Sequence, residues 1–294
     1  MSFRAGHVAL IGRPNVGKSS LLNAFVGAHL GAVSPKPHTT QKLLLGVRTF
    51  ENAQIAFVDT PGLQKRRPNA VHKSMDRAFD RGLSSVDLVV LVVEAGAFNP
   101  GDRAALERAK HTERPIALVI NKVDLVKNKS ELLPYIDKLS REHAFAAILL
   151  VSARKENGTE EAVKRLAELL PSQEPLYPAD TLTDRSERFL AAELIREQLM
   201  RQLGDEVPYA CAVEIEAFTV EGALRRIHAT IWVERDGQKA IVIGEGGQQL
   251  KFIGSKAREA MEALFDGRVH LELWVKVRAD WSDNERALKQ LGFE

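Results

Sequence analysis

The stretch Gly12-Arg-Pro-Asn-Val-Gly17-Lys18-Ser19 fits the pattern G-x-x-x-x-G-K-[ST] and decides most of what this chain can be. An apolar run at residues 8–11 precedes it and predicts a buried strand, and the residues after Ser19 predict the start of a helix. A strand, a Gly-rich loop and a helix together form a cradle whose backbone N–H groups face a polyanion. Lys18 adds a positive charge at the terminal phosphates, and the Ser19 hydroxyl suits Mg²⁺. The alternative is an ordinary Gly-containing turn between a strand and a helix. The predicted phosphate-binding residues are Gly12, Arg13, Pro14, Asn15, Val16, Gly17, Lys18, Ser19 and Ser20.

Composition places the chain among globular proteins. Its 294 residues are enough for two separate cores, and 45% apolar with 27% charged residues is an ordinary balance. The single cysteine, Cys211, excludes a disulfide framework and fits the reducing cytoplasm. No apolar run is long enough to cross a bilayer, and the N-terminus lacks the apolar segment of a signal peptide, so we expect no transmembrane segment. Acidic residues outnumber basic ones in residues 184–294, so any nucleic-acid contact there must be local.

Five apolar runs with strand character are spaced along the first half of the chain. They occupy residues 8–11, 55–58, 88–93, 116–120 and 148–151, and segments with helical character lie at 70–82, 102–110, 130–143 and 159–170. This alternation predicts a mostly parallel, doubly wound α/β sheet with helices on both faces. A further run at 43–50 precedes a short turn and the second strand, which predicts a hairpin and one antiparallel edge strand.

Three prolines between Pro171 and Pro178 end the first pattern and predict an inter-domain linker. We therefore divide the chain into a nucleotide-binding domain at 1–171, a linker at 172–183 and a smaller α+β domain at 184–294. Asp184 and Glu187 have the spacing of a capping box and predict a helix to about residue 203. Strands are expected at 210–220, 226–235 and 269–278, and a helix after Gly244-Glu-Gly-Gly247.

Polar motifs follow four of the five apolar runs, at the strand ends where ligands bind in such sheets. Asp59-Thr60-Pro61-Gly62 follows the second run; its carboxylate suits Mg²⁺ through water, and the Gly62 amide suits a γ-phosphate. Asn121-Lys122-Val-Asp124 and Ser152-Ala153-Arg154 follow the last two runs. A carboxylate at Asp124 accepts from both donors of guanine and would face an acceptor in adenine, which leaves it unpaired. Each motif by itself also fits a solvated turn.

The order of these motifs, with Asn15 in the phosphate loop, resembles the translation-factor class of P-loop GTPases, in the branch of the Era and tRNA-modification GTPases. The resemblance implies GTP binding and Mg²⁺-dependent hydrolysis to GDP and phosphate. It implies Mg²⁺ ligation by Ser19 and by a threonine of the next loop, Thr40 rather than Thr39, and a K⁺ ligand at Asn15. The usual residue after this threonine is Arg, and Gln41 departs from the pattern, so both threonines stay open.

The expected switch II residues are Asp59, Thr60, Pro61, Gly62 and Leu63, and the last of these departs from the Ras-like enzymes. Those enzymes orient the attacking water with a Gln at that position. Leu63 has no polar group for this, so we expect slow intrinsic hydrolysis, with water held by backbone groups.

Gly244-Glu245-Gly246-Gly247 fits the G-x-x-G loop with which KH domains clamp single-stranded RNA. A KH loop requires a helix at 240–243, where the sequence pattern also allows a strand. The G-x-x-G pattern by itself fits an ordinary turn equally well. The surrounding sequence, including the segment from Leu273 to Trp281, resembles the tail of the Era GTPase family. The resemblance then covers essentially the whole chain. It implies a type II KH domain, single-stranded 16S rRNA near its 3′ end and the 30S subunit as partners, and peripheral membrane association of some members.

The expected RNA-binding residues are Gly244, Glu245, Gly246, Gly247, Lys251, Lys256, Arg278 and Trp281. Glu245 departs from the basic residue that would help to bind a phosphate. Trp281 and Trp274 fit either stacking platforms or core positions.

Three functions compete. The first is a GTP-switched RNA-binding assembly factor, and the second is a GTPase coupled to tRNA modification or another RNA-processing step. The tail lacks Cys-x-x-Cys and clustered His, which disfavours chemistry there. The third is an ATP-using kinase or transporter subunit, which Asn121-Lys-Val-Asp124 disfavours.

Overall fold

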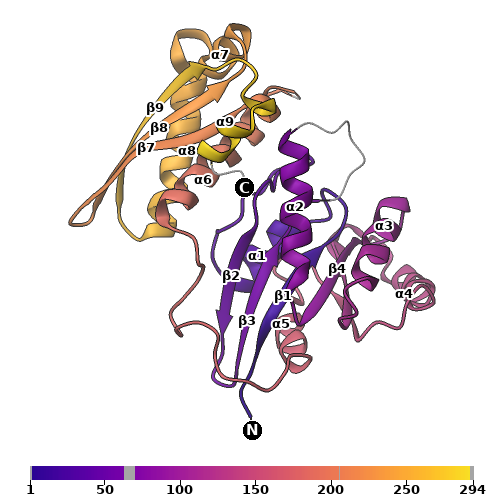
Figure 1. The fold of residues 1–294 in the computed structure, drawn as a ribbon. Coiled ribbons are helices and arrows are strands. Elements are labelled where there is room, and N and C mark those ends of the chain that lie inside the picture. Colours follow the sequence, from indigo (N-terminus) through magenta and orange to yellow (C-terminus); the bar gives the residue numbers. More distant parts are fainter. Residues whose placement is uncertain (1, 63–69, 205, 292–294) are drawn as a thin grey trace. The chain divides into compact units, whose positions relative to one another are not determined.

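The computed structural model describes residues 2–62, 70–204 and 206–291 (Figure 1). The chain forms two compact units, the first ending at Asp184 and the second beginning at Arg185. Two short segments of the N-terminal half, one of them residues 32–39 and the other ending at Ser74, are grouped with the second unit. Within the described residues, no helix is long and apolar enough to span a bilayer.

The first unit is built on a sheet with the strand order β2-β3-β1-β4-β5-β6. Its strands are β1 (Arg4–Ile11), β2 (Leu44–Thr49), β3 (Ala53–Asp59), β4 (Leu88–Glu94), β5 (Ile116–Asn121) and β6 (Ala147–Leu150). All neighbouring pairs are parallel except β2 with β3, which form the expected hairpin. The predicted parallel sheet with one antiparallel edge strand is therefore confirmed.

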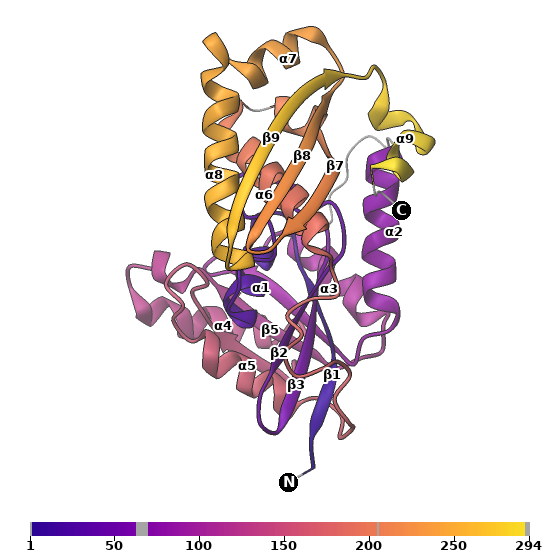
Figure 2. The same ribbon diagram turned by 90° about the vertical axis from the view of Figure 1, so that its left-hand side faces the viewer.

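Helices cover both faces of this sheet (Figures 1 and 2). They are α1 (Lys18–Val26), α2 (Ala70–Ser84), α3 (Pro100–Lys110), α4 (Leu132–Ser140) and α5 (Thr159–Glu168). Phe79, Leu106 and Leu139 from α2, α3 and α4 join the apolar side chains of β1, β4 and β5 in one core cluster. α1 and α5 pack against each other and against β1 and β3. The strands are buried on both faces, which explains their nearly continuous apolar sequences.

The proline-containing stretch after α5 is attached to the first unit over most of its length. Gln54, fully buried in β3, accepts hydrogen bonds from the amides of Leu176 and Tyr177 at 2.8 and 2.9 Å. Farther on, the Leu182 carbonyl accepts from Val47 N at 2.8 Å, which pairs this stretch with the exposed side of edge strand β2. The stretch therefore satisfies the edge amide of Val47, which would otherwise be open to another chain.

The second unit is a three-stranded sheet, β7-β8-β9, with helices packed on it. Its elements are α6 (Glu187–Gln202), β7 (Ala212–Glu221), β8 (Leu224–Val233), α7 (Asp236–Ile243), α8 (Gln248–Phe265), β9 (Arg268–Val277) and α9 (Glu285–Gln290). β7 and β8 are antiparallel, whereas β8 and β9 are parallel and are joined through α7 and α8. The expected smaller α+β fold is confirmed, and residues 240–243 are helical as a KH loop requires.

The predicted cap of α6 is wrong. Ser186, not Asp184, is the N-cap, and its side chain accepts from Phe189 N. With Ser186 as the N-cap, Glu187 is the first residue of the helix and not the third, so it does not occupy the position that completes a capping box. Its carboxylate instead accepts from two nitrogens of Arg225 of β8 at 2.7 and 2.8 Å. The local pattern therefore placed the start of the helix two residues too early.

Candidate functional site

The polar motifs of the first unit meet at the carboxyl ends of the parallel strands. Asp59 ends β3 beside Leu10 of β1, and Asn121 ends β5 beside Glu94 of β4. The phosphate loop follows β1 and leads into α1, and Ser152 follows β6 closely. The structure thus brings the four motif-bearing strand ends together at the carboxyl end of the sheet.

Lys18 is the first residue of α1, and its side chain is turned back into the loop. Its Nζ donates to the carbonyls of Gly12 and Arg13 at 3.0 and 3.1 Å, and only 6% of the residue is exposed. Burial lowers the pKa of Lys18 to about 8, although the charge of Asp59 opposes this change. An ammonium held by neutral carbonyls in this way is available to an anion that enters the loop.

Three oxygens that suit a hard cation lie within hydrogen-bonding distance of each other. Ser19 Oγ donates to Asp59 Oδ2 at 2.6 Å and lies 2.6 Å from Thr40 Oγ1, which itself donates to Asp59 Oδ2 at 3.1 Å. Two hydroxyls and a carboxylate are the ligand types that Mg²⁺ prefers. Thr39 is directed elsewhere, because its hydroxyl donates to the Lys36 carbonyl at 2.8 Å and lies 2.7 Å from Ser34 Oγ. The structure therefore places Thr40, not Thr39, with Ser19 and Asp59.

Asn121 joins the strand end of β5 to both neighbouring loops. Its Nδ2 donates to the Val16 carbonyl at 2.8 Å, and its Oδ1 accepts from Ala153 N at 3.1 Å. Gly17 has φ 97°, and a Cβ there would lie 2.4 Å from Asn121 Nδ2. Only glycine allows this left-handed turn to approach the amide so closely.

The predicted guanine-reading residues form a second group. Ser152 Oγ donates to Asp124 Oδ1 at 2.6 Å, so the carboxylate is oriented by the loop after β6. Lys122 has a left-handed φ of 63°, and its Nζ donates to Glu94 Oε2 at 3.2 Å. Arg154, the last residue of the Ser152-Ala153-Arg154 motif, is exposed. Asp124, Ser152, Asn121 and Ala153 are thus brought together as the spacing of the motifs predicts.

The remaining predicted residues lie around the phosphate loop. Asn15 adopts a left-handed φ of 65° and is exposed. Gly62 lies against the loop, since a Cβ there would come within 3.0 Å of Pro14 N. Thr60 is buried, and its hydroxyl donates to the Leu10 carbonyl at 2.8 Å. Leu63, with the rest of the segment up to residue 69, lies outside the described residues.

Sequence reasoning missed two acidic residues beside the site. Glu94 ends β4, the one apolar run with no motif after it, and Arg13 Nη2 donates to it at 3.0 Å. Asp102 of α3 is fully buried and accepts from Arg13 Nε at 3.2 Å. The sequence did hold one signal for Glu94: it stands at the end of an apolar run, and the other four runs are each followed there by a polar motif.

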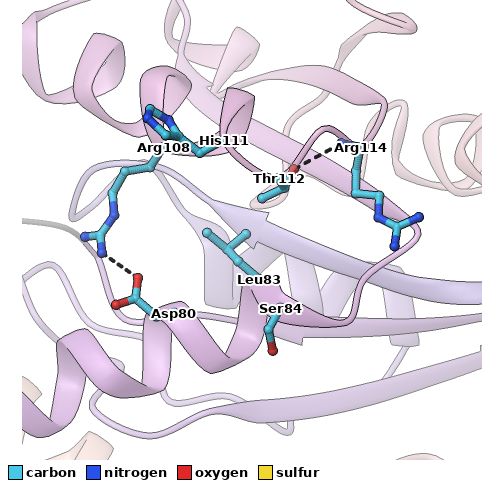
Figure 3. A pocket seen from close by; sticks show the side chains of 7 residues that line it. All are labelled: Asp80, Leu83, Ser84, Arg108, His111, Thr112 and Arg114. Atoms are coloured by element: carbon cyan, nitrogen blue, oxygen red, sulfur yellow. Dashed lines mark hydrogen bonds and ion pairs between the residues drawn. The ribbon is translucent and has the colours of Figure 1, made fainter.

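A pocket of about 570 Å³ lies elsewhere in the first unit, between the ends of α2 and α3 (Figure 3). Figure 3 shows Arg108 of α3 paired with Asp80 of α2, and both residues line the pocket. None of the predicted nucleotide-binding residues lines this pocket.

The G-x-x-G loop of the second unit connects α7 to α8. Gly246 and Gly247 have φ 55° and 77°, and a Cβ at either position would meet nothing within 4 Å. The loop backbone therefore stands open on its outer side, as a backbone clamp requires. Glu245 and Lys251 are exposed beside it, and Lys256 is exposed but paired with Glu259 at 2.8 Å. Arg278, just after β9, is half-buried and donates its backbone N–H to the Val233 carbonyl.

The two candidate stacking residues differ sharply. Trp281 is 1% exposed, and its indole N–H donates to the Ala210 carbonyl at 3.2 Å, so the expectation that it stacks on RNA is wrong. Its ring fills the core of the second unit beside the start of β7. Trp274 of β9, in contrast, is 58% exposed.

Comparison with known proteins agrees with this geometry. A family model described as 50S ribosome-binding GTPase matches residues 7–122, and a KH-domain model matches residues 206–282. The GTPase Era of Xanthomonas oryzae pv. oryzae (strain MAFF 311018) is 54% identical over 291 residues, which cover 99% of this chain and 97% of that protein. The GTPase Era of Stenotrophomonas maltophilia (strain K279a) is 52% identical over 289 residues, with coverage of 98% and 97%.

A solved structure of Era in complex with MgGDPNP and nucleotides 1506–1542 of 16S ribosomal RNA matches with a TM-score of 0.94. That chain is 36% identical, and the match covers 99% of both chains. The fold and the family that the motifs predicted are confirmed. By its motifs, its fold and its full-length similarity, the chain belongs to the GTPase Era family.

Proposed function

We propose that this protein is a GTP-binding and GTP-hydrolysing switch that binds the 3′ end region of 16S rRNA and assists assembly of the 30S subunit. One observation carries the proposal: a complete guanine-nucleotide motif set and an open G-x-x-G loop in a KH fold occur in one chain. The Era structure described above, with its RNA fragment, resembles this chain over its full length. The alternative, a GTPase coupled to tRNA modification, has no comparable support.

In the proposed site, the backbone N–H groups of residues 12–20, except Pro14, and the Lys18 ammonium bind the phosphates. Asp124 reads guanine, Lys122 lies along the base, and the Ala153 amide reaches the guanine carbonyl. Asn121 braces both loops through its two hydrogen bonds. The loop that contains Asp59 and Gly62 senses the γ-phosphate.

The oxygens of Ser19, Thr40 and Asp59 fit a Mg²⁺ ion, Asp59 through water. When bound, Mg²⁺ neutralises charge that develops on the phosphate oxygens. Asn15 is proposed as a K⁺ ligand. Intrinsic hydrolysis is slow because Leu63 stands where Ras-like enzymes have a water-orienting Gln.

The RNA is held by the second unit. The open backbone at Gly246 and Gly247 accommodates a phosphodiester, and Lys251 supplies charge next to it. Trp274 replaces Trp281 as the aromatic candidate for stacking on a base. We assign residues 1–171 to GTP binding, 172–183 to the linker and 184–294 to RNA binding. The protein is proposed to act in the cytoplasm, with peripheral contact to the membrane.

Nucleotide competition tests the first half of the proposal. GTP and GDP should displace a fluorescent GDP analogue from the full-length protein, and ATP should fail to do so at about 10⁴-fold higher concentration. Equal displacement by ATP would remove the basis for the guanine assignment.

A charge inserted into the clamp tests the second half. Gly246→Asp should weaken binding of an oligonucleotide with the 3′-terminal sequence of 16S rRNA and leave GDP affinity unchanged. Gly222→Asp is the matched control, because Gly222 in the β7–β8 turn has φ 61° and also has nothing within 4 Å of a built Cβ. Equal RNA affinity of both variants would place the RNA elsewhere on the protein.

A further inference from the structure

The strand end without a recognised motif holds a carboxylate between two functional loops. β4 ends at Glu94, which is paired with Asn121 in the parallel register of β4 and β5. The backbone there is fixed as well, because the Tyr135 hydroxyl donates to the Glu94 carbonyl at 3.0 Å. Glu94 is thus held at the centre of the sheet edge, and its side chain is oriented toward both loops.

One oxygen of this carboxylate binds a cation from each loop. Glu94 Oε2 accepts from Arg13 Nη2 of the phosphate loop at 3.0 Å and from Lys122 Nζ of the guanine loop at 3.2 Å. All three side chains are only 20–30% exposed, so water screens these pairs less than it screens surface ion pairs. Without the acid, the two cations would repel each other.

Arg13 has a second, deeper anchor. Its Nε donates to Oδ2 of the fully buried Asp102 at 3.2 Å, and this oxygen also accepts from Asn99 N at 3.0 Å. Asp102 and Asn99 form the capping box at the start of α3, so the anchor is part of a helix end.

The two acids differ electrostatically. Burial raises the pKa of Asp102 above its usual value, and the backbone N–H of Asn99 and the charge of Arg13 oppose this only in part. Burial also works against the charged form of Glu94, but Lys122 and Arg13 outweigh it and hold the pKa of Glu94 below its usual value. Glu94 is therefore charged at neutral pH, and it is the acid that both cations share.

We propose that Glu94 is a positioning residue that couples the phosphate loop to the guanine loop through its shared carboxylate oxygen, with Asp102 holding Arg13 in place. The inference rests on the proposed nucleotide site. A guanine nucleotide spans both loops, so its release requires them to loosen, and the carboxylate slows that release.

Dissociation of a fluorescent GDP analogue, measured by stopped flow on the full-length protein, tests the coupling. Glu94→Gln should accelerate release about tenfold, because the amide loses charge-assisted bonds to both loops. Glu142→Gln is the matched control: its side chain is 24% exposed and pairs with Arg103 of α3, and neither residue belongs to either loop. This control should release GDP at the wild-type rate.

A double-mutant cycle separates coupling from a general loss of structure. Arg13→Gln and Lys122→Gln should show non-additive effects on the release rate in the wild-type background and additive effects in the Glu94→Gln background. A purely structural Glu94 would leave the Arg13–Lys122 coupling intact. Coupling that persists in Glu94→Gln, or a release rate within about twofold of wild type in Glu94→Gln, would overturn the inference.

The result also separates this inference from the proposed function. Wild-type protein that binds ADP as tightly as GDP sinks the nucleotide assignment itself. Wild-type protein that prefers GDP, with a Glu94→Gln variant that behaves like Glu142→Gln, sinks only the role of Glu94.

Discussion

The reading of guanine by Asp124 can be tested through the orientation of a single amide. Ser152 Oγ donates to Asp124 Oδ1 at 2.6 Å. Ser152 Oγ already accepts from Lys155 N at 3.2 Å, so in the Asp124→Asn variant we expect the hydroxyl to keep donating and the amide oxygen to take the Oδ1 position. The NH₂ group then takes the position of Oδ2, so that a donor faces the donor groups of guanine.

The magnitude follows from the bonds that are lost. Two hydrogen bonds to a carboxylate are each worth about 1.5–3 kcal/mol, and Asp124 is half-buried, so the lower part of that range applies. GTP affinity should therefore fall about 10²- to 10³-fold. Xanthine has a carbonyl where guanine has its amine, so the variant should bind xanthosine triphosphate more tightly than the wild type does.

The assay is displacement of a fluorescent GDP analogue by GTP and by xanthosine triphosphate. Asp137→Asn is the control, because it removes a carboxylate of α4 that pairs with the exposed Arg141. Adding Ser152→Ala to Asp124→Asn frees the amide to turn its oxygen to the base, and part of the GTP affinity should return. An unchanged preference for GTP in Asp124→Asn would falsify the base-reading role.

Three further variants probe other parts of the molecule. Lys18→Ala should weaken GDP binding about 100-fold or more, as measured by calorimetry. The melting temperature of the nucleotide-free protein should stay nearly unchanged, because burial already disfavours the charge of Lys18. A large drop in melting temperature would contradict this expectation. Gln54→Ala removes the hydrogen bonds to Leu176 and Tyr177, so proteolysis within 172–183 should accelerate, and equal cleavage rates would show that other contacts hold this stretch. Trp281→Ala should destabilise the second unit by about 3–5 kcal/mol in urea unfolding without a specific loss of RNA affinity in the folded protein. A stable Trp281→Ala variant with weak RNA binding would return this residue to the RNA site.

The chemistry of the nucleotide site was predictable because its information is local. Gly17 and Lys18 owe their roles to a turn and a helix start that lie within a few residues of each other. The motifs with Asp59, Asn121 and Ser152 each follow a buried strand, and parallel strands bring their carboxyl ends to one edge whatever the details of packing. Motif order and strand ends therefore determined the ligand class, the sheet and most of the site.

Other features depend on residues that are far apart in the sequence. Glu94 and Asp102 are isolated acids in the sequence and acquire a partner only because β4 and α3 lie beside Arg13. Glu187 of α6 forms an ion pair with Arg225 of β8, and packing beside β7 makes Trp281 a core residue. The threonine hydroxyl that meets Ser19 and Asp59 was open in the sequence, where Thr39 and Thr40 are adjacent, and the path of the loop selects Thr40.

The sequence by itself thus determined the fold class, the nucleotide chemistry and the family, since these follow from short motifs placed at strand ends. Only the tertiary structure decided which acids brace the phosphate loop, which tryptophan is exposed and which threonine meets Ser19. The physical reason is that ion pairing and burial are properties of side chains brought together by folding, and a linear pattern does not specify which distant partner arrives.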